Sequence, residues 1–135
     1  MFNKRNTKGN TSVMHIAVHT TGTRPEMRLT QLDNLNYHYL VTRSGKLLSL
    51  KPVKRKDKII DIAWLGGIDK SGKHVDNRTP EQNDTLFNTL MLLSERCDIA
   101  EIVPADKLYP YGFPNPGFDL KKWLAGYIPD FLLRA

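Results

Sequence analysis

One apolar run constrains the fold of this 135-residue chain more than any other feature. Residues 59–65 read IIDIAWL and are closed by Gly66 and Gly67. A nearly continuous run of this length, rich in isoleucine and bounded by glycines, is typical of a strand that is buried on both faces of a sheet. The run therefore predicts a central strand in a domain that combines strands with helices.

The clearest helix follows this run. Thr79-Pro80-Glu81-Gln82 places a capping hydroxyl before a proline at the first helical position, with a glutamine three residues after the hydroxyl, and this is the capping-box pattern. Apolar residues then recur at spacings of three and four, as on one face of a helix. That face comprises Leu86, Leu90, Leu93 and Cys97, widened by Phe87 and Met91. We expect this helix to lie on the sheet, with Cys97 as a buried helical cysteine.

The remaining segments alternate in type along the chain. A hairpin is indicated by two strand-like segments around the turn-forming Ser44-Gly45 pair. A short helix is indicated by Asp119, which can cap it, with Phe118 and Trp123 facing inward. Strands are expected at residues 13–19, 37–42, 47–50 and 99–103, and a weakly helical or irregular piece at 26–36. This order predicts one α/β domain of two or three layers over residues 13–135, preceded by a flexible basic leader at residues 1–12.

Composition excludes several classes of protein. Hydrophobic residues make up 40% of the chain, but the apolar stretches are far shorter than the roughly 20 residues of a transmembrane helix, so no membrane partner is expected. The single cysteine, Cys97, excludes an intramolecular disulfide and cannot by itself build a thiolate metal site. The polar, basic N-terminus lacks the apolar segment of a secretory signal, which predicts a protein that is cytoplasmic as synthesised.

Positive charge is concentrated in the first half of the chain. Residues 1–60 hold twelve Lys and Arg against three acidic residues, whereas residues 61–135 hold eight against eleven. The densest part is residues 51–58, KPVKRKDK, called the basic loop below. Such a surface attracts anionic polymers, such as nucleic acid or wall glycopolymers. The basic loop has no interleaved aromatic residues on which bases could stack, which weakens a single-strand binding role.

Four segments together resemble the landmarks of a known family. They are IAVHTTGTRP, NYHYLVTRSGKL, WLGGIDKSGKHVDNRTPEQ and NPGFDLKKWL, and they follow the family's order between residues 13 and 124. The family is that of the type 2 N-acetylmuramoyl-L-alanine amidases, which includes phage lysozyme-type amidases and peptidoglycan recognition proteins. The resemblance implies a central mixed β-sheet with helices packed on it, a groove for a stem peptide and its muramic acid, and a zinc ion at the groove floor. Members cut the bond between the lactyl group of muramic acid and the L-alanine of the stem peptide.

The resemblance implies three zinc ligands, of which one is retained. A catalytic zinc takes about three protein ligands from His, Cys or carboxylate groups and activates a bound water. The first ligand position matches His19, whereas the second falls on Ala105 and the third on Asn115. Alanine has no donor atom, and a neutral amide is a poor replacement for a thiolate or carboxylate. Asp106 is the candidate substitute if the site is rebuilt around zinc, and otherwise no cofactor is expected.

Further residues are assigned to catalysis and substrate binding by the resemblance. Tyr37 matches a family tyrosine that helps to polarise the scissile carbonyl or to orient the water. The family's cation near the third ligand falls on Phe113, which cannot stabilise an oxyanion. The groove is expected to be lined or rimmed by His38 and by three cations of the basic loop, Lys54, Arg55 and Lys56.

These observations favour an amidase-fold protein that has lost, or nearly lost, zinc-dependent hydrolysis and that binds peptidoglycan or muropeptides. One alternative is an active zinc amidase whose ligands are His19, Asp106 and a residue outside the matched positions. Another is a protein of a phage or mobile element whose basic face binds an acidic macromolecule. Access to the cell wall would follow the phage type of release, in which another protein opens the membrane.

Overall fold

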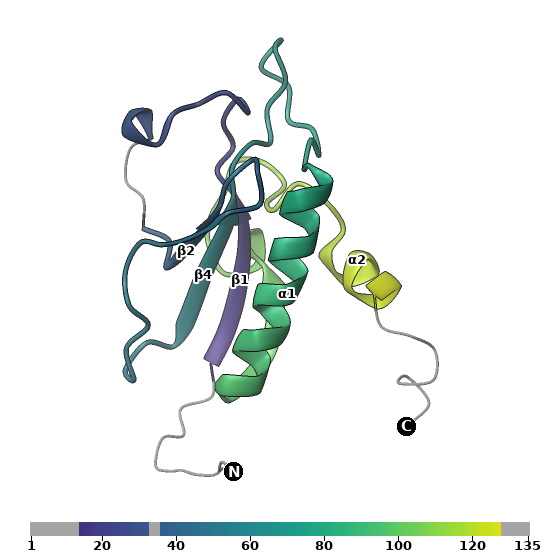
Figure 1. Ribbon diagram of the computed structural model, residues 1–135. Coiled ribbons are helices and arrows are strands. Elements are labelled where there is room, and N and C mark those ends of the chain that lie inside the picture. The colour runs from purple at the N-terminus through teal and green to yellow at the C-terminus, as the bar shows by residue number, and fades with distance from the viewer. Residues whose placement is uncertain (1–13, 33–35, 128–135) are drawn as a thin grey trace.

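A computed structural model describes residues 14–32 and 36–127, and the leader predicted at residues 1–12 lies outside the described residues (Figure 1). The described residues form one five-stranded sheet in the order β3-β2-β4-β1-β5. Its strands are β1 (Met14–Thr20), β2 (Tyr39–Val41), β3 (Leu47–Ser49), β4 (Ile59–Trp64) and β5 (Ile99–Pro104). The helices are α1 (Pro80–Arg96) and α2 (Leu120–Tyr127), with short 3-10 turns η1 (Leu29–Gln31) and η2 (Ala105–Lys107).

The apolar run forms the central strand, as predicted. β4 pairs in parallel with β1 on one side and with β2 on the other. β1 also pairs in parallel with β5, whereas β2 and β3 form the predicted antiparallel hairpin. The sheet is therefore mixed, as the resemblance implied, and both central strands are parallel to their neighbours.

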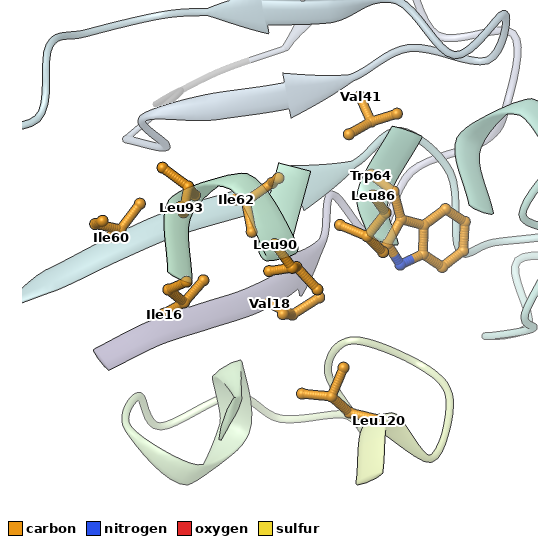
Figure 2. Packing of buried hydrophobic residues seen from close by; sticks show 10 residues of the cluster. All are labelled: Ile16, Val18, Val41, Ile60, Ile62, Trp64, Leu86, Leu90, Leu93 and Leu120. Atoms are coloured by element: carbon orange, nitrogen blue, oxygen red, sulfur yellow. The ribbon is translucent and has the colours of Figure 1, made fainter. Parts of the chain in front are cut away.

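Helix α1 covers one face of this sheet, in front of β1 and β4, with α2 beside it (Figure 1). Successive strand residues point to opposite faces, so alternate residues of β1 and β4 reach the helix. Figure 2 shows these side chains against the apolar face of α1. The cluster comprises Ile16, Val18, Val41, Ile60, Ile62, Trp64, Leu86, Leu90, Leu93 and Leu120. The intervening positions, which include His19 and Asp61, face the other side of the sheet.

Helix α1 begins as predicted and ends one residue early. The Thr79 hydroxyl accepts a hydrogen bond from the Gln82 amide, and the Gln82 side chain accepts one from the Thr79 amide, both at 3.0 Å. Cys97 is the C-cap residue in extended conformation and is half-buried, so the expectation of a buried helical cysteine is wrong. The chain leaves the helix there because β5 must begin at Ile99, which pairs with Met14.

The smaller elements, η1 and α2, lie where the sequence predicted helical segments. In the segment expected to be weakly helical or irregular, the turn η1 is the helical part, and residues 33–35 lie outside the described residues. Helix α2 is capped as predicted, since Asp119 Oδ1 accepts a hydrogen bond from the Lys122 amide. Phe118 and Trp123 pack against the main core. Within residues 14–32 and 36–127, no helix is long and apolar enough to cross a membrane.

Candidate functional site

A pocket of about 310 Å³ lies beside His19. It lies on the sheet face away from α1, because His19 of β1 and Asp61 of β4 point there. The segment before β2 and the loop after η2 supply its other walls. The lining residues are His19, Asn36, Tyr37, Asp61, Tyr109, Pro110 and Tyr111. Four of these seven residues carry aromatic rings, and one carries a carboxylate.

A chain of hydrogen bonds crosses the pocket floor. His19 Nε2 lies 2.8 Å from Asp61 Oδ1, and His19 Nδ1 lies 2.8 Å from the Tyr111 hydroxyl. The Tyr109 hydroxyl donates to the same Asp61 oxygen, also at 2.8 Å. A carboxylate can only accept, so the hydrogen lies on Nε2 and, in the neutral imidazole, Nδ1 accepts from Tyr111. Both ring nitrogens of the buried His19 are therefore used inside the protein.

The pocket keeps its three phenols protonated. Burial raises the pKa of Tyr37 to about 12, and the neighbouring Tyr111 and Asp61 add to this shift. Burial and the hydrogen bond to Asp61 raise the pKa of Tyr109 far above its ordinary value. Burial and the charge of Asp61 raise the pKa of Tyr111 in the same direction. Near neutral pH all three side chains are uncharged, and each can donate a hydrogen bond.

The residues at the zinc-ligand positions do not fit a zinc ion. Ala105 is fully buried at the start of η2 and offers no side-chain donor. Asn115 is also buried, and its amide is occupied: Oδ1 accepts from the Thr20 amide at 2.8 Å, and Nδ2 donates to the Thr20 carbonyl at 3.4 Å. Within the described ranges, no three His, Cys, Asp or Glu residues are grouped so that they could hold a metal ion.

The Asn115 side chain acts in place of a sheet strand. Strand β5 ends at Pro104, which pairs with Val18 of β1. The backbone of Thr20, two residues further along β1, therefore has no β5 residue beside it. The Asn115 amide then bonds both the N–H and the C=O of Thr20. Asp106, the candidate substitute ligand, is exposed and accepts a hydrogen bond from the Asn115 backbone amide through Oδ2 at 3.1 Å. These contacts tie the loop after η2 to the end of β1.

His38 lies behind the pocket floor rather than among its lining residues. The His38 side chain is 5% exposed. Its Nδ1 accepts a hydrogen bond from the Asp61 backbone amide at 3.0 Å, and its Nε2 donates to Asp57 Oδ2 at 3.2 Å. The Lys54 amide donates to the same Asp57 oxygen at 2.8 Å. This backbone hydrogen bond, together with His38, lowers the pKa of Asp57. His38 thereby joins the basic loop to β4.

The three cations expected at the groove rim, Lys54, Arg55 and Lys56, are all exposed. Because His38 bonds both Asp57 and Asp61, the basic loop is held next to the strand that supplies the pocket floor. Phe113, at the position of the family's cation, stacks on the exposed His74 with ring centroids 4.3 Å apart. The Tyr111 ring lies 5.4 Å from that of Phe113, so the aromatic surface continues outward from the pocket.

Sequence analysis missed five of the seven lining residues, namely Asn36, Asp61, Tyr109, Pro110 and Tyr111. Asp61 carried a signal, because it is the single charged residue in the apolar run at residues 59–65 and isolated buried charges are seldom present without a partner. Tyr109 and Tyr111 stand in the YPYGF segment, where nothing local indicates that they turn back onto β1. Tyr37, which was expected in the site, does line the pocket, and its ring meets that of His19 edge-on at 5.0 Å.

No protein-family model matches the chain. A search of known sequences finds a relative in the endolysin of Escherichia phage T7, which is 24% identical over 127 residues. The matched region covers 80% of this chain and 83% of the phage protein. The similarity thus extends over most of both chains.

Solved structures share the same fold. The endolysin N-acetylmuramoyl-L-alanine amidase LysCS from Clostridium intestinale matches with a TM-score of 0.63 and 15% identity, over 85% of this chain and 83% of that one. The ectodomain of the Drosophila receptor PGRP-LCa matches with a TM-score of 0.55 and 12% identity, over 86% and 84%. The chain therefore has the fold of N-acetylmuramoyl-L-alanine amidases and peptidoglycan recognition proteins, which confirms the resemblance seen in the sequence. A shared fold does not carry an activity with it.

Proposed function

We propose that this protein binds peptidoglycan or muropeptides in the pocket beside His19 and does not cut them by a zinc mechanism. One observation carries the proposal: the retained His19 is held by Asp61 and Tyr111, next to an open pocket, while Ala105 and Asn115 stand where two metal ligands are expected. The similarity to an endolysin, an amidase and a peptidoglycan recognition receptor supports the wall polymer as the ligand.

The pocket has the character of a binding site. Its volume of about 310 Å³ is at the lower end of the range for small-ligand sites. Its rings offer flat apolar surfaces, while the phenols of Tyr37, Tyr109 and Tyr111 offer polar edges. Such a surface suits a fragment that presents both carbon–hydrogen faces and polar groups, as amino sugars and short peptides do.

Co-sedimentation with purified sacculi at physiological ionic strength tests the proposal. We expect the wild-type protein to pellet with sacculi and Tyr111→Ala to pellet at least several-fold less, because the variant loses a pocket wall. Leu108→Ala is the matched control, since Leu108 is exposed, belongs to the same loop and does not line the pocket. Failure of the wild-type protein to pellet above a basic control protein would overturn the proposal.

Incubation of labelled sacculi with the protein and added zinc tests the absence of hydrolysis. We expect no release of stem peptides and no new amino-terminal alanine. Release that His19→Ala abolishes would establish the alternative, an active zinc amidase.

The basic loop supports a second candidate function, contact with an acidic macromolecule. The acidic residue of this loop, Asp57, accepts hydrogen bonds from His38 and from the Lys54 amide. The side chains of Lys54, Arg55 and Lys56 are exposed. Reversal of these three charges is expected to abolish any salt-sensitive binding to nucleic acid or anionic wall polymer. Absence of wild-type binding to both polymers at low salt would remove this candidate.

A further inference from the structure

The buried His38 lies between two aspartates from different parts of the chain. On one side, Nε2 donates to Asp57 Oδ2 of the basic loop at 3.2 Å. On the other side, Nδ1 accepts a hydrogen bond from the Asp61 backbone amide at 3.0 Å. The Asp61 carboxylate is also near, since its Oδ2 lies 3.9 Å from the same nitrogen. That distance is longer than a hydrogen bond.

This arrangement requires a neutral imidazole. A ring nitrogen that accepts a hydrogen bond from an amide carries no hydrogen of its own, so the hydrogen of the His38 ring lies on Nε2. Histidine is the side chain that ordinarily changes its charge between about pH 5 and 8. When His38 takes a proton, Nδ1 becomes a donor that faces the Asp61 amide, which is a donor too. The hydrogen bond between them must then break.

The charged groups around the ring favour one rearrangement. From the basic loop, Asp57 faces Nε2, and it stays ionised in this range because the Lys54 amide and His38 lower its pKa. The charge of the exposed Lys51 also acts on Asp57. From β4, the carboxylate of Asp61 faces Nδ1. Both carboxylates attract an imidazolium.

We propose that His38 is a proton-operated switch between the basic loop and the pocket floor. On protonation by solvent, Nδ1 leaves the Asp61 backbone amide and donates to Asp61 Oδ2, while Nε2 keeps its bond to Asp57. The oxygen Oδ2 is the one that turns to His38, because Oδ1 accepts from His19 and Tyr109 on the pocket side. The added charge lies beside the basic loop, so the loop attracts anionic polymers more strongly in mild acid.

Nuclear magnetic resonance of nitrogen-15-labelled protein between pH 8 and pH 5 tests the switch. The chemical shifts of the ring nitrogens distinguish an unprotonated Nδ1 from a protonated one. We expect His38 Nδ1 to gain its proton on acidification, and the exchange protection of the Asp61 amide to fall by about tenfold or more. The amide of the fully buried Leu90 should keep its protection, since the change is local.

Three results would overturn the switch in the wild-type protein: an unprotonated His38 Nδ1 at pH 5, a protonated Nδ1 with the Asp61 amide still protected, or an equal fall in protection at Leu90. The last result would mean global unfolding. These measurements need no variant, so they stand even if a substitution of His38 prevents folding.

His38→Gln separates this switch from the other histidines. A glutamine amide can accept from the Asp61 backbone and donate to Asp57, but it takes no proton in this range. We expect the Asp61 amide of the variant to stay protected at both pH values. His74→Gln is the matched control and should retain the wild-type change, because His74 is exposed and its ring stacks on Phe113. A fall in protection in His38→Gln as large as in wild type would overturn the proposal.

Binding to heparin, whose sulfate groups stay charged throughout, tests the effect on the basic loop. We expect the affinity of the wild-type protein to rise by about twofold or more from pH 8 to pH 5.5, and that of His38→Gln to rise less. Equal gains in the two proteins, or no binding by wild type at either pH, would overturn this effect. The switch goes beyond the proposed function, and none of these measurements uses a muropeptide, so their failure leaves that function in place.

Discussion

His19 Nε2 and Asp61 Oδ1 lie 2.8 Å apart on neighbouring strands, so a carboxylate holds the imidazole that the resemblance assigns to zinc. Their strands are parallel, and His19 pairs in register with Ala63, two residues beyond Asp61. The two side chains are therefore diagonal neighbours on one face of the sheet. The Tyr111 hydroxyl forms a hydrogen bond with the other ring nitrogen, His19 Nδ1. The imidazole at the position that the resemblance assigns to a metal ligand is thus hydrogen-bonded to protein groups through both nitrogens.

Zinc content gives the first prediction. We expect well under one zinc per chain after dialysis against excess zinc and removal of loosely bound metal. A catalytic site needs about three protein donors, and of the three matched positions His19 alone supplies a donor suited to zinc. A bound structural metal contributes directly to folding, so a chelator would lower the Tm of a protein that holds one. We expect a chelator to leave the Tm of this protein unchanged. About one retained zinc per chain, lost in His19→Ala, would contradict this prediction and would favour the alternative of an active zinc amidase.

The second prediction concerns the Asn115 amide. Asn115→Ala should lower the free energy of unfolding by about 1–3 kcal/mol, because it leaves the buried N–H and C=O of Thr20 without their partner. Asn88→Ala is the control, since Asn88 is exposed on α1 and its substitution should change stability by less than about 0.5 kcal/mol. Urea unfolding measures both. Equal stability of the two variants would show that the amide does not support the end of β1.

The sequence predicted those parts of the fold that short segments specify. The apolar run before Gly66 became β4, and the Thr79 capping box became the start of α1, because each signal lies within a few neighbouring residues. Cys97 was placed wrongly because helical periodicity continued for one residue beyond the helix. The end of α1 is set instead by the pairing of Ile99 with Met14, which the local sequence does not contain.

The candidate site was only partly predictable, for the same reason. Tyr37 and His19 were found through the motifs that carry the resemblance. Tyr109 contacts Asp61 from 48 residues away, and Tyr111 contacts His19 from 92 residues away. Such distant pairs become visible only once the loop after η2 is seen to fold back onto the sheet. Asp61 alone had a local signal, as a charge within an apolar strand.

The third prediction tests the packing between α1 and the sheet. Leu90→Ala should cost about 2–5 kcal/mol, because Leu90 is fully buried in the main core and its truncation leaves a cavity. Leu92→Ala, two residues along the same helix, should cost far less because Leu92 is 43% exposed. Thermal and urea unfolding of the two variants give the comparison. Similar losses would mean that α1 is not held to the sheet by the face shown in Figure 2.

The fourth prediction concerns alkaline pH. Burial, with Tyr111 and Asp61, raises the pKa of Tyr37 to about 12 in the folded protein, against about 10 when unfolded. The unfolded phenol ionises first, so the stability that this group contributes is complete below about pH 10 and is lost as the pH rises towards 12.

Tyr37→Phe removes this ionisation and should therefore lose less stability over the same range, gaining about 1 kcal/mol per pH unit relative to wild type. Urea unfolding at several values between pH 9 and 11 measures the difference. Tyr109 and Tyr111 titrate in both proteins, so their contributions cancel to first order. Parallel losses of stability in the two proteins would mean that Tyr37 titrates as an exposed phenol, and the pocket wall that it forms would then be open to water.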